Sequence, residues 1–305
     1  IFLFKRLEQK KLIFFFYYGW LFGFGYFFTN LYWISISLTF DENFTFLIPV
    51  ASVIIPSFLA LFYSLITFLY RLYNPKNVLS AFFLFSSLFG LVEFMRGTVL
   101  TGFPWNLVVY SFSEYLNFLG ILSVIGTYSL NLIVISLFII PGIIILKKSK
   151  KEIVVSILLL FLPILFFFYG ILQKKEFLSK LEKENSYTIR IIGSNISLDR
   201  FNDVSQSKIV IDELILISSP EKDRKIFFVW PEGIIPNLYR DELNLYKNIF
   251  KTNFDKNHLI GLGLTSKELS MNSHKYFNSF SIFDNDLNLI ENYNKINLVP
   301  FGEFL

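Results

Sequence analysis

The chain has 305 residues, a formal net charge of +4 and a hydrophobic fraction of 53%. This fraction is too high for an ordinary soluble enzyme and favours a membrane protein, while the small net charge gives no reason to expect nucleic acid as a partner. The chain contains no cysteine, which excludes disulfide bonds and thiolate metal sites within these residues.

Five apolar stretches in the first half of the chain are long enough, or nearly so, to cross a bilayer, which takes ~20 apolar residues. The predicted spans are 12–40, 44–70, 78–100, 116–146 and 153–172. Only the third contains acidic or basic residues. We therefore expect a helical transmembrane domain over residues 1–172. From residue 173 to residue 305, charges are distributed as in a soluble domain.

The charges that flank the predicted spans indicate an orientation. The basic residues before the first span and after the second and fourth are Lys5, Arg6, Lys10, Lys11, Arg71, Lys76, Lys147, Lys148, Lys150 and Lys151. The positive-inside rule places these segments in the cytoplasm. Five crossings then bring residue 173 and the following domain to the outer face of the membrane.

The third span carries Glu93 and Arg96, which lie one helical turn apart and can pair. Charges within a span are functional by default, although a paired anchor near the membrane surface explains them equally well. The segment from Gly102 to Trp105 breaks the helix at the outer surface. Trp105 is a candidate for contact with lipid there.

Beyond residue 186 the pattern changes to short strands alternating with helices, which predicts an α/β layered domain. Strands are expected at 187–196, 225–230, 258–266 and 276–284, a further strand begins near 291, and helices are expected at 202–218 and 240–253. The segment KIFFVW (225–230) is apolar on both faces. Such a strand is typical of a sheet that is covered on both sides.

Two charged residues follow predicted strands and are candidates for catalysis. Glu232 comes directly after KIFFVW, at the strand end where α/β proteins often carry functional groups. If it is partly desolvated it can act as a general base, whereas a solvated loop acid or a helix N-cap is the simpler interpretation. Lys295 can stabilise a negative oxygen or be a surface lysine, and Glu303 is equally ambiguous by itself.

Other polar residues of the second domain give weaker signals. Asn278 in YFNSF can position a substrate or pair with the backbone of a turn. Gly261 and Gly263 do not form a phosphate loop and are interpreted as strand packing. His258 and His274 have no partners at metal-ligand spacing, so we predict no metal site and interpret both as surface residues.

Several motifs together resemble the apolipoprotein N-acyltransferase family of bacteria, whose catalytic domain is of the nitrilase (carbon-nitrogen hydrolase) type. They are GWLFGFGYFFTNLYWI (19–34), EFMRGTVLTGFPWNLVVYS (93–111), FVWPEGIIP (228–236), FNS (277–279) and YNKINLVPFGEF (293–304). The resemblance implies an α-β-β-α sandwich on the periplasmic, or outer, face of the bacterial inner membrane. It also implies a multi-pass membrane protein.

The resemblance implies a Glu-Lys-Cys site that needs no cofactor. Glu232 is then the general base, Lys295 the oxyanion stabiliser and Glu303 the supporting acid, while Asn278, Phe201 and Trp105 line the substrate site. The nucleophilic cysteine is absent, so we expect a fragment that lacks both ends and is inactive alone. The implied reaction moves an acyl chain from a phospholipid to the N-terminal amine of diacylglyceryl-cysteine in an apolipoprotein, through a thioester.

One motif departs from the family pattern, and two other functions stay open. The first strand of the second domain continues as GSNISLDRF, where the family has a longer pattern ending in Lys-Trp, so the lipid contact of Phe201 is altered. A membrane-anchored, nitrilase-like amidase would use the same residues to hydrolyse a C–N bond. A transporter or non-catalytic membrane scaffold would not bring Glu232, Lys295 and Glu303 together.

Overall fold

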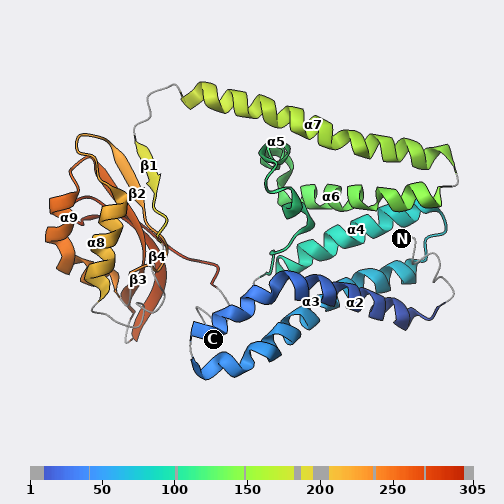
Figure 1. The fold of residues 1–305 in the computed structure, drawn as a ribbon, viewed down its shortest axis with the longest axis horizontal. Helices are drawn as coiled ribbons and strands as arrows, with labels where there is room; N and C mark the ends of the chain where they lie inside the picture. Colours follow the sequence, from blue (N-terminus) through green and yellow to red (C-terminus); the bar gives the residue numbers. More distant parts are fainter. Residues whose placement is uncertain are drawn as a thin grey trace. The chain divides into compact units, whose positions relative to one another are not determined.

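The chain divides into two compact units, Ile1–Glu182 and Lys183–Leu305, and each is described by itself (Figure 1). The structure is a computed structural model. It describes residues 10–40, 42–99, 102–147, 149–181, 187–194, 206–235, 238–270 and 273–298.

The first unit is helical throughout its regular structure. Its elements, with η for a 3-10 helix, are α2 (Leu12–Leu31), η1 (Tyr32–Phe40), η2 (Glu42–Leu47), α3 (Ile48–Tyr73), α4 (Val78–Arg96), η4 (Val108–Phe112), α5 (Leu116–Leu119), α6 (Leu122–Leu146) and α7 (Lys150–Leu181). Five helical segments have the length and apolar composition to cross a membrane: Leu12–Thr39, Glu42–Tyr73, Val78–Arg96, Leu122–Leu146 and Lys150–Lys180. The predicted multi-span helical fold is thereby confirmed.

Helix α2 packs along α3 through small residues. A Cβ atom added to Gly19 would lie 2.2 Å from Oγ1 of Thr67, and one added to Gly23 would lie 2.9 Å from Cα of Ala60. The Thr67 hydroxyl donates to the carbonyl of Phe15 across this contact, at 2.6 Å. Small residues and interhelical hydrogen bonds are what hold helices together in a lipid environment, where apolar burial gives little net drive.

The stretch 116–146, expected as one continuous span, is divided in the structure. The short helix α5 ends at Leu119, and α6 begins at Leu122. Gly126 in the first turn of α6 has φ of 73°, a left-handed conformation that favours glycine. Gly120 next to α5 lies so near α7 that an added Cβ would be 2.8 Å from Cα of Gly170.

The second unit contains a five-stranded mixed sheet in the order β1-β2-β3-β4-β5. The strands are β1 (Thr188–Ile191), β2 (Ile226–Val229), β3 (His258–Ser270), β4 (Ser273–Phe283) and β5 (Leu289–Asn294). β1, β2 and β3 are parallel, and β4 and β5 continue the sheet in antiparallel fashion. The helical elements between them are α8 (Ser207–Ser218), η7 (Arg240–Tyr246) and α9 (Lys247–Asn253).

Helices α8 and α9 lie on the same face of this sheet (Figure 1). Their buried side chains, such as Ile211 and Phe250, join those of Phe228 and Ile260 in one hydrophobic core. Buried Trp230, directly after β2, donates its indole N–H to the hydroxyl of Ser218 at 2.9 Å. The chain turn that leads to Glu232 is therefore anchored to α8.

The opposite face of the sheet is open within the described ranges. Ile189 and Ile191 of β1 are exposed there, whereas Ile226 and Phe228 of β2 face the helical layer and are buried. This mixed sheet with one helical layer is consistent with a nitrilase-like domain. The second sheet and outer helices of a complete α-β-β-α sandwich have no counterpart among the residues that the structure describes.

His258 is buried, so its interpretation as a surface residue is wrong. Its Nδ1 accepts the backbone N–H of Asp255 at 3.1 Å, and its Nε2 lies 3.0 Å from the carbonyl oxygen of Glu221. Because Nδ1 accepts, the neutral ring carries its hydrogen on Nε2 and donates it to that carbonyl. The ring therefore links the start of β3 to the segment after α8. His274 is exposed, as expected.

Candidate active site

Glu232 occupies a tight turn that follows β2. The strand continues one residue further through a hydrogen bond from the N–H of Trp230 to the carbonyl of Gly261, at 2.8 Å. Gly233, next to Glu232, has φ of 60° and so occupies the left-handed region, which glycine reaches without strain. The turn thus places the carboxylate just beyond the carboxyl end of β2 and beside β3.

The structure brings Lys295 and Asn278 to this carboxylate. Nδ2 of Asn278 donates to Oε1 of Glu232 at 2.6 Å, and Nζ of Lys295 lies 3.4 Å from the same oxygen. The backbone N–H of Lys295 also donates to the carbonyl of Asn278 at 2.8 Å, so β4 and the residue after β5 are joined beside Glu232. An acid, an amide and an ammonium group from three separate segments therefore meet at one point.

A pocket of about 730 Å³ opens at this point. It is lined by Glu232, Gly233, Ile235, Leu238, Tyr239, Gly263, Leu264, Thr265, Tyr276, Phe277 and Asn278. Its volume lies within the range of small-molecule sites, about 300–1,000 Å³. Its lining combines apolar side chains, such as Leu238 and Phe277, with polar ones, such as Glu232 and Asn278, and therefore suits a ligand that has both an apolar part and a reactive polar centre.

The Glu232 carboxylate is more accessible than we expected. Its side chain is 61% exposed and that of Lys295 is 32% exposed, so within the described residues the partial desolvation expected for Glu232 is not seen. Ion pairs at this exposure contribute little to stability, typically about 0–1 kcal/mol. The meeting of the two groups is therefore a consequence of chain topology rather than of their mutual attraction.

Two residues of the site, Tyr239 and Tyr276, were missed at the level of sequence, and a third, Gly263, was interpreted as strand packing without its contact with Glu232. A Cβ atom added to Gly263 would lie 2.9 Å from Cα of Glu232, so this glycine lets the turn rest directly on β3. Tyr239 and Tyr276 line the pocket with their ring centroids 5.9 Å apart. The signal for Tyr276 was available, because alternate residues of a strand share a face and Tyr276 precedes Asn278 by two.

A ladder of polar side chains, buried in β3 and β4 and partly buried in β5, runs toward Lys295. The hydroxyls of Ser266 and Ser279 are 2.6 Å apart, and Ser279 donates to Oδ1 of Asn294 at 2.7 Å. Asn292 donates its amide to the same oxygen at 2.9 Å. Because Asn294 directly precedes Lys295, this ladder fixes the strand end from which the lysine projects.

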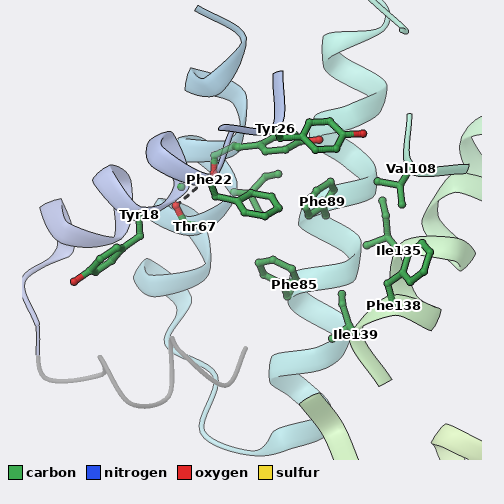
Figure 2. A pocket seen from close by; sticks show the side chains of 13 residues that line it. Tyr18, Phe22, Tyr26, Thr67, Phe85, Phe89, Val108, Ile135, Phe138 and Ile139 are labelled. Carbon is green, nitrogen blue, oxygen red and sulfur yellow. Dashed lines mark hydrogen bonds between the residues drawn. The ribbon is translucent and has the colours of Figure 1, made fainter. Parts of the chain in front are cut away.

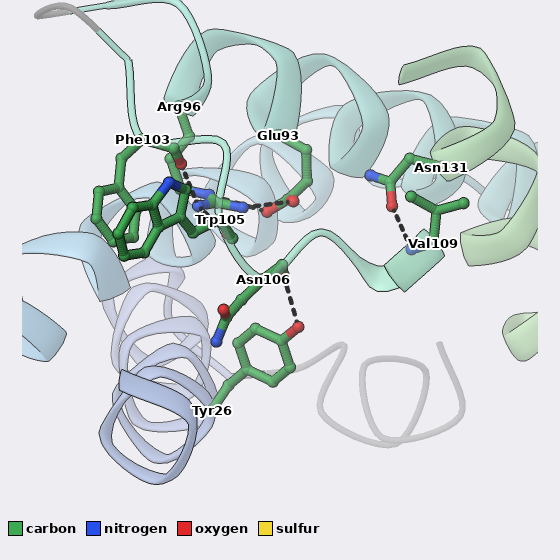
Figure 3. Close-up of polar contacts among 8 residues, drawn as sticks. All are labelled: Tyr26, Glu93, Arg96, Phe103, Trp105, Asn106, Val109 and Asn131. Atoms are coloured by element: carbon green, nitrogen blue, oxygen red, sulfur yellow. Dashed lines mark hydrogen bonds and ion pairs between the residues drawn. The ribbon is translucent and has the colours of Figure 1, made fainter. Parts of the chain in front are cut away.

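Trp105, predicted to contact substrate, lies in the membrane unit and not in the second unit. It is 46% exposed and stacks on Trp33, with ring centroids 4.9 Å apart. Close to it, Glu93 and Arg96 form a fully buried ion pair at 2.7 Å (Figure 3). The paired interpretation of these two charges is thus confirmed. Glu303 and Phe201 lie outside the described residues.

A second pocket, of about 490 Å³, lies within the membrane unit between α2, α3, α4 and α6 (Figure 2). Its walls are mostly aromatic and aliphatic, with Phe22, Phe85, Phe89 and Ile135 among them. Such a space suits hydrocarbon. It carries no polar cluster that suggests chemistry, since its Thr67 hydroxyl is already bonded to the Phe15 carbonyl.

Neither pocket offers a metal site. Within the ranges that the structure describes, no group of three His, Cys, Asp or Glu side chains gathers at a distance suited to a metal ion. The chemistry available to the Glu232 cluster is proton transfer by a carboxylate and stabilisation of a negative oxygen by an ammonium group and an amide.

Comparison with known proteins gives a consistent result. Residues 1–140 match the family model described as the apolipoprotein N-acyltransferase N-terminal domain. The chain is similar to the protein named apolipoprotein N-acyltransferase from Rhodopseudomonas palustris, with 32% identity over 299 residues, which cover 94% of this chain and 55% of that protein.

Relatives of the same name show similar values. The protein from Rhizobium leguminosarum is 28% identical over 294 residues, covering 94% of this chain and 55% of the relative. The protein from Sinorhizobium medicae is 28% identical over 310 residues, covering 99% of this chain and 56% of the relative. The chain spans about half the length of the curated relatives that it matches.

Proposed function

We infer from these matches that the chain is a member of the apolipoprotein N-acyltransferase family, and we propose that the full-length protein transfers an acyl chain from a phospholipid to the N-terminal amine of diacylated lipoproteins. The contact of Lys295 with Glu232, at 3.4 Å beside Asn278 and the 730 Å³ pocket, carries the proposal. The proposed setting is the bacterial inner membrane, with the second unit on its outer face.

The proposed reaction needs a thiol. The 305 residues contain no cysteine, so the nucleophile must come from sequence outside them. In the first half-reaction, Glu232 takes the proton of this thiol and the thiolate attacks the ester carbonyl of the phospholipid. The ammonium group of Lys295 stabilises the negative oxygen of the tetrahedral intermediate. The C–O bond then breaks, Glu232 returns the proton to the leaving oxygen, and a lysophospholipid departs.

The second half-reaction regenerates the thiol. The free α-amine of the lipoprotein attacks the thioester carbonyl, and Lys295 again stabilises the negative oxygen. Glu232 accepts a proton from the amine and delivers it to the departing sulfur. The products are an amide and the original thiol. Asn278, which donates to Oε1 of Glu232, holds the carboxylate in one orientation through both steps.

The helical unit supports the proposal because both proposed substrates are anchored in the bilayer. Five segments able to cross a membrane hold the chain in the same bilayer as a phospholipid and a lipidated protein. The pocket beside Glu232, which has both apolar and polar walls, suits an acyl ester. Glu303, proposed as the supporting acid, and Phe201, proposed to touch lipid, belong to the same assignment.

The test uses the full-length gene product in phospholipid micelles with a diacylglyceryl-cysteine peptide. We expect N-acylated peptide and lysophospholipid in equal amounts, and a loss of at least about 100-fold in Glu232→Gln. Glu268→Gln, which removes an exposed acid from the same sheet, is the matched control and should retain activity. Free fatty acid in place of acylated peptide would favour a nitrilase-like hydrolase. No turnover of either kind would favour a scaffold.

A further inference from the structure

Residues 102–109 of the membrane unit form a segment that comprises an irregular loop and the first two residues of η4, and side chains from three helices bind its polar backbone groups. Arg96 of α4 donates through Nη1 to the carbonyls of Phe103 and Trp105, at 2.5 and 2.9 Å. Its other nitrogens, Nε and Nη2, bond to the two carboxylate oxygens of Glu93 at 3.2 and 2.7 Å (Figure 3). The planar guanidinium thus has fixed partners on both sides.

Two further side chains hold the same segment. The hydroxyl of Tyr26, from α2, donates to the carbonyl of Asn106 at 2.7 Å. Oδ1 of Asn131, a buried residue of α6, accepts the backbone N–H of Val109 at 2.9 Å (Figure 3). Buried backbone polar groups that lack hydrogen-bond partners are costly, so irregular backbone persists only where the protein supplies those partners. These contacts meet that requirement.

The backbone of the segment is also specific. Gly102 has φ of 83°, and a Cβ atom there would lie 2.2 Å from the carbonyl oxygen of Gly97. Asn106 has φ of 57°, a conformation that few residues other than glycine adopt. These two left-handed positions are four residues apart, each at or beside a carbonyl that a side chain binds, and they restrict the backbone conformations open to the segment.

The segment presents aromatic side chains at its surface. Trp105 is 46% exposed and Trp33 of η1 is 42% exposed, and their rings stack with an interplanar angle of 14°. Phe103 lies against Trp105, with ring centroids 5.5 Å apart. The rings of Trp33, Trp105 and Phe103 thus form one aromatic surface beyond the end of α4. The buried Glu93–Arg96 pair holds the backbone that carries Phe103 and Trp105.

We propose that Tyr26, Glu93, Arg96 and Asn131 are positioning residues that fix residues 102–109, so that Trp105 and Trp33 form a rigid contact surface for the acyl chain of the phospholipid substrate. The identity of the substrate rests on the proposed function, whereas the clamp itself rests only on the contacts above. In this proposal the four residues act through residues 102–109 and not directly on the reacting atoms. Their effect is on how well an acyl chain binds and not on the chemical step.

The test compares Tyr26→Phe and Asn131→Leu, which each remove one contact with little change in volume. Tyr17→Phe is the matched control, because Tyr17 lies exposed on the same helix. Amide hydrogen exchange of residues 103–109 should speed up roughly 2- to 10-fold in both variants and stay unchanged in the control. In the full-length enzyme, KM for phospholipid should rise by a similar factor with kcat nearly constant.

A second measurement does not depend on acyl transfer. Brominated acyl chains should quench the Trp105 contribution to fluorescence, taken as the difference from Trp105→Phe, and this quenching should fall in the two clamp variants. Arg96→Lys, which keeps the charge but not the planar fork, should behave like them if it folds. Faster exchange with unchanged quenching and unchanged KM would overturn the proposal while leaving the proposed function intact. A full-length enzyme without acyltransferase activity would refute the proposed function, and reduced quenching would still support the clamp.

Discussion

Nζ of Lys295 lies 3.4 Å from Oε1 of Glu232, although 63 positions separate the two residues in the sequence. The strand order alone leaves β3 and β4 between β2 and β5. The turn after β2 rests on Gly263 of β3, which brings Glu232 within reach of Asn278 in β4 and of Lys295 after β5. The backbone bond from Lys295 to Asn278 completes this connection at 2.8 Å.

Replacing Lys295 by Met should abolish acyl transfer without unfolding the protein. The side chain is one-third exposed and its ion pair is weak, so stability should change by less than about 1 kcal/mol. Loss of an oxyanion donor typically lowers kcat by about 100- to 1,000-fold. Single-turnover formation of the proposed thioester in the full-length enzyme measures this effect.

Lys275→Met is the control for this substitution, because Lys275 is an exposed residue of the adjacent strand β4. It should keep full activity. An enzyme with Lys295→Met that still forms the thioester at the native rate would exclude this lysine from the chemistry, whatever its distance from Glu232.

The polar ladder behind Lys295 makes a separate prediction. Ser279 is buried and bonds to both Ser266 and Asn294, so Ser279→Ala removes a partner from the partly buried Asn294 and from the buried Ser266 hydroxyl. We expect a loss of about 1–3 kcal/mol in the free energy of unfolding. Because Asn294 precedes Lys295, kcat should also fall several-fold, more than stability alone explains.

Thr252→Ala serves as the comparison for Ser279→Ala, since the Thr252 hydroxyl bonds only to its own helix, at the exposed carbonyl of Asn248. Chemical denaturation and initial rates at a temperature where both variants are fully folded separate the two effects. Equal kcat in the two variants would limit the ladder to a role in stability.

Local sequence pattern located the elements but not their contacts. The run at 225–230 is recognisable as a strand because aromatic and β-branched residues dominate it, and the run at 258–266 because it is a short, largely apolar stretch; β2 and β3 are found there. Which strand pairs with which across tens of residues is not a local property. The meeting of Glu232 and Lys295 was therefore implied only by resemblance to a family.

The burial of individual side chains was the second property that could not be predicted from the sequence. His258 stands at the start of a strand beside polar residues. Nothing in the local sequence shows that its ring bonds to the backbone N–H of Asp255 and to the carbonyl of Glu221. Conversely, Glu232 follows a buried strand and is still exposed within the described part of the chain. The burial of His258 and the exposure of Glu232 both depend on which other parts of the fold pack against them, and not on the residues next to them in the sequence.

The membrane unit shows the same limit. The i, i+3 spacing of Glu93 and Arg96 was enough to predict their pairing, because such residues are neighbours on a helix. The two carbonyls that Arg96 also binds lie seven and nine residues away, in a loop of irregular conformation. Helical periodicity carries no information about a contact of that kind.

Gly19 should be essential for the packing of α2 on α3. An added methyl group would lie 2.2 Å from Oγ1 of Thr67 and 2.5 Å from the carbonyl oxygen of Tyr63, so Gly19→Ala must separate the helices. We expect a marked fall in the thermal unfolding temperature in detergent, since overpacking typically costs about 1–3 kcal/mol.

Gly25, on the same helix, provides the control for Gly19. Nothing lies within 4 Å of a Cβ atom added there, so Gly25→Ala should be neutral or slightly stabilising through its better helix propensity. Equal unfolding temperatures for the two alanine variants would show that α2 and α3 do not approach each other as closely as the structure has them.

Acid should weaken the second unit through Glu221. A hydrogen bond from Arg190, at 2.6 Å, lowers the pKa of the Glu221 carboxyl below its ordinary value of 4.5, with a smaller contribution from Arg224. A carboxyl group whose pKa is lower in the folded than in the unfolded state stabilises the fold fully above the unfolded pKa. That contribution is lost as the pH falls through the folded value.

Glu221→Gln removes this titration, so the variant should be less stable than the wild type at neutral pH and the difference should shrink below pH 4.5. Trp230, the one tryptophan in residues 183–305, reports unfolding of this unit when Trp20, Trp33 and Trp105 are replaced by Phe. Glu268→Gln, an exposed acid of β3, should show no comparable pH dependence. A difference between wild type and Glu221→Gln that stays constant from pH 7 to pH 3 would mean that Arg190 does not hold this carboxylate in its charged form.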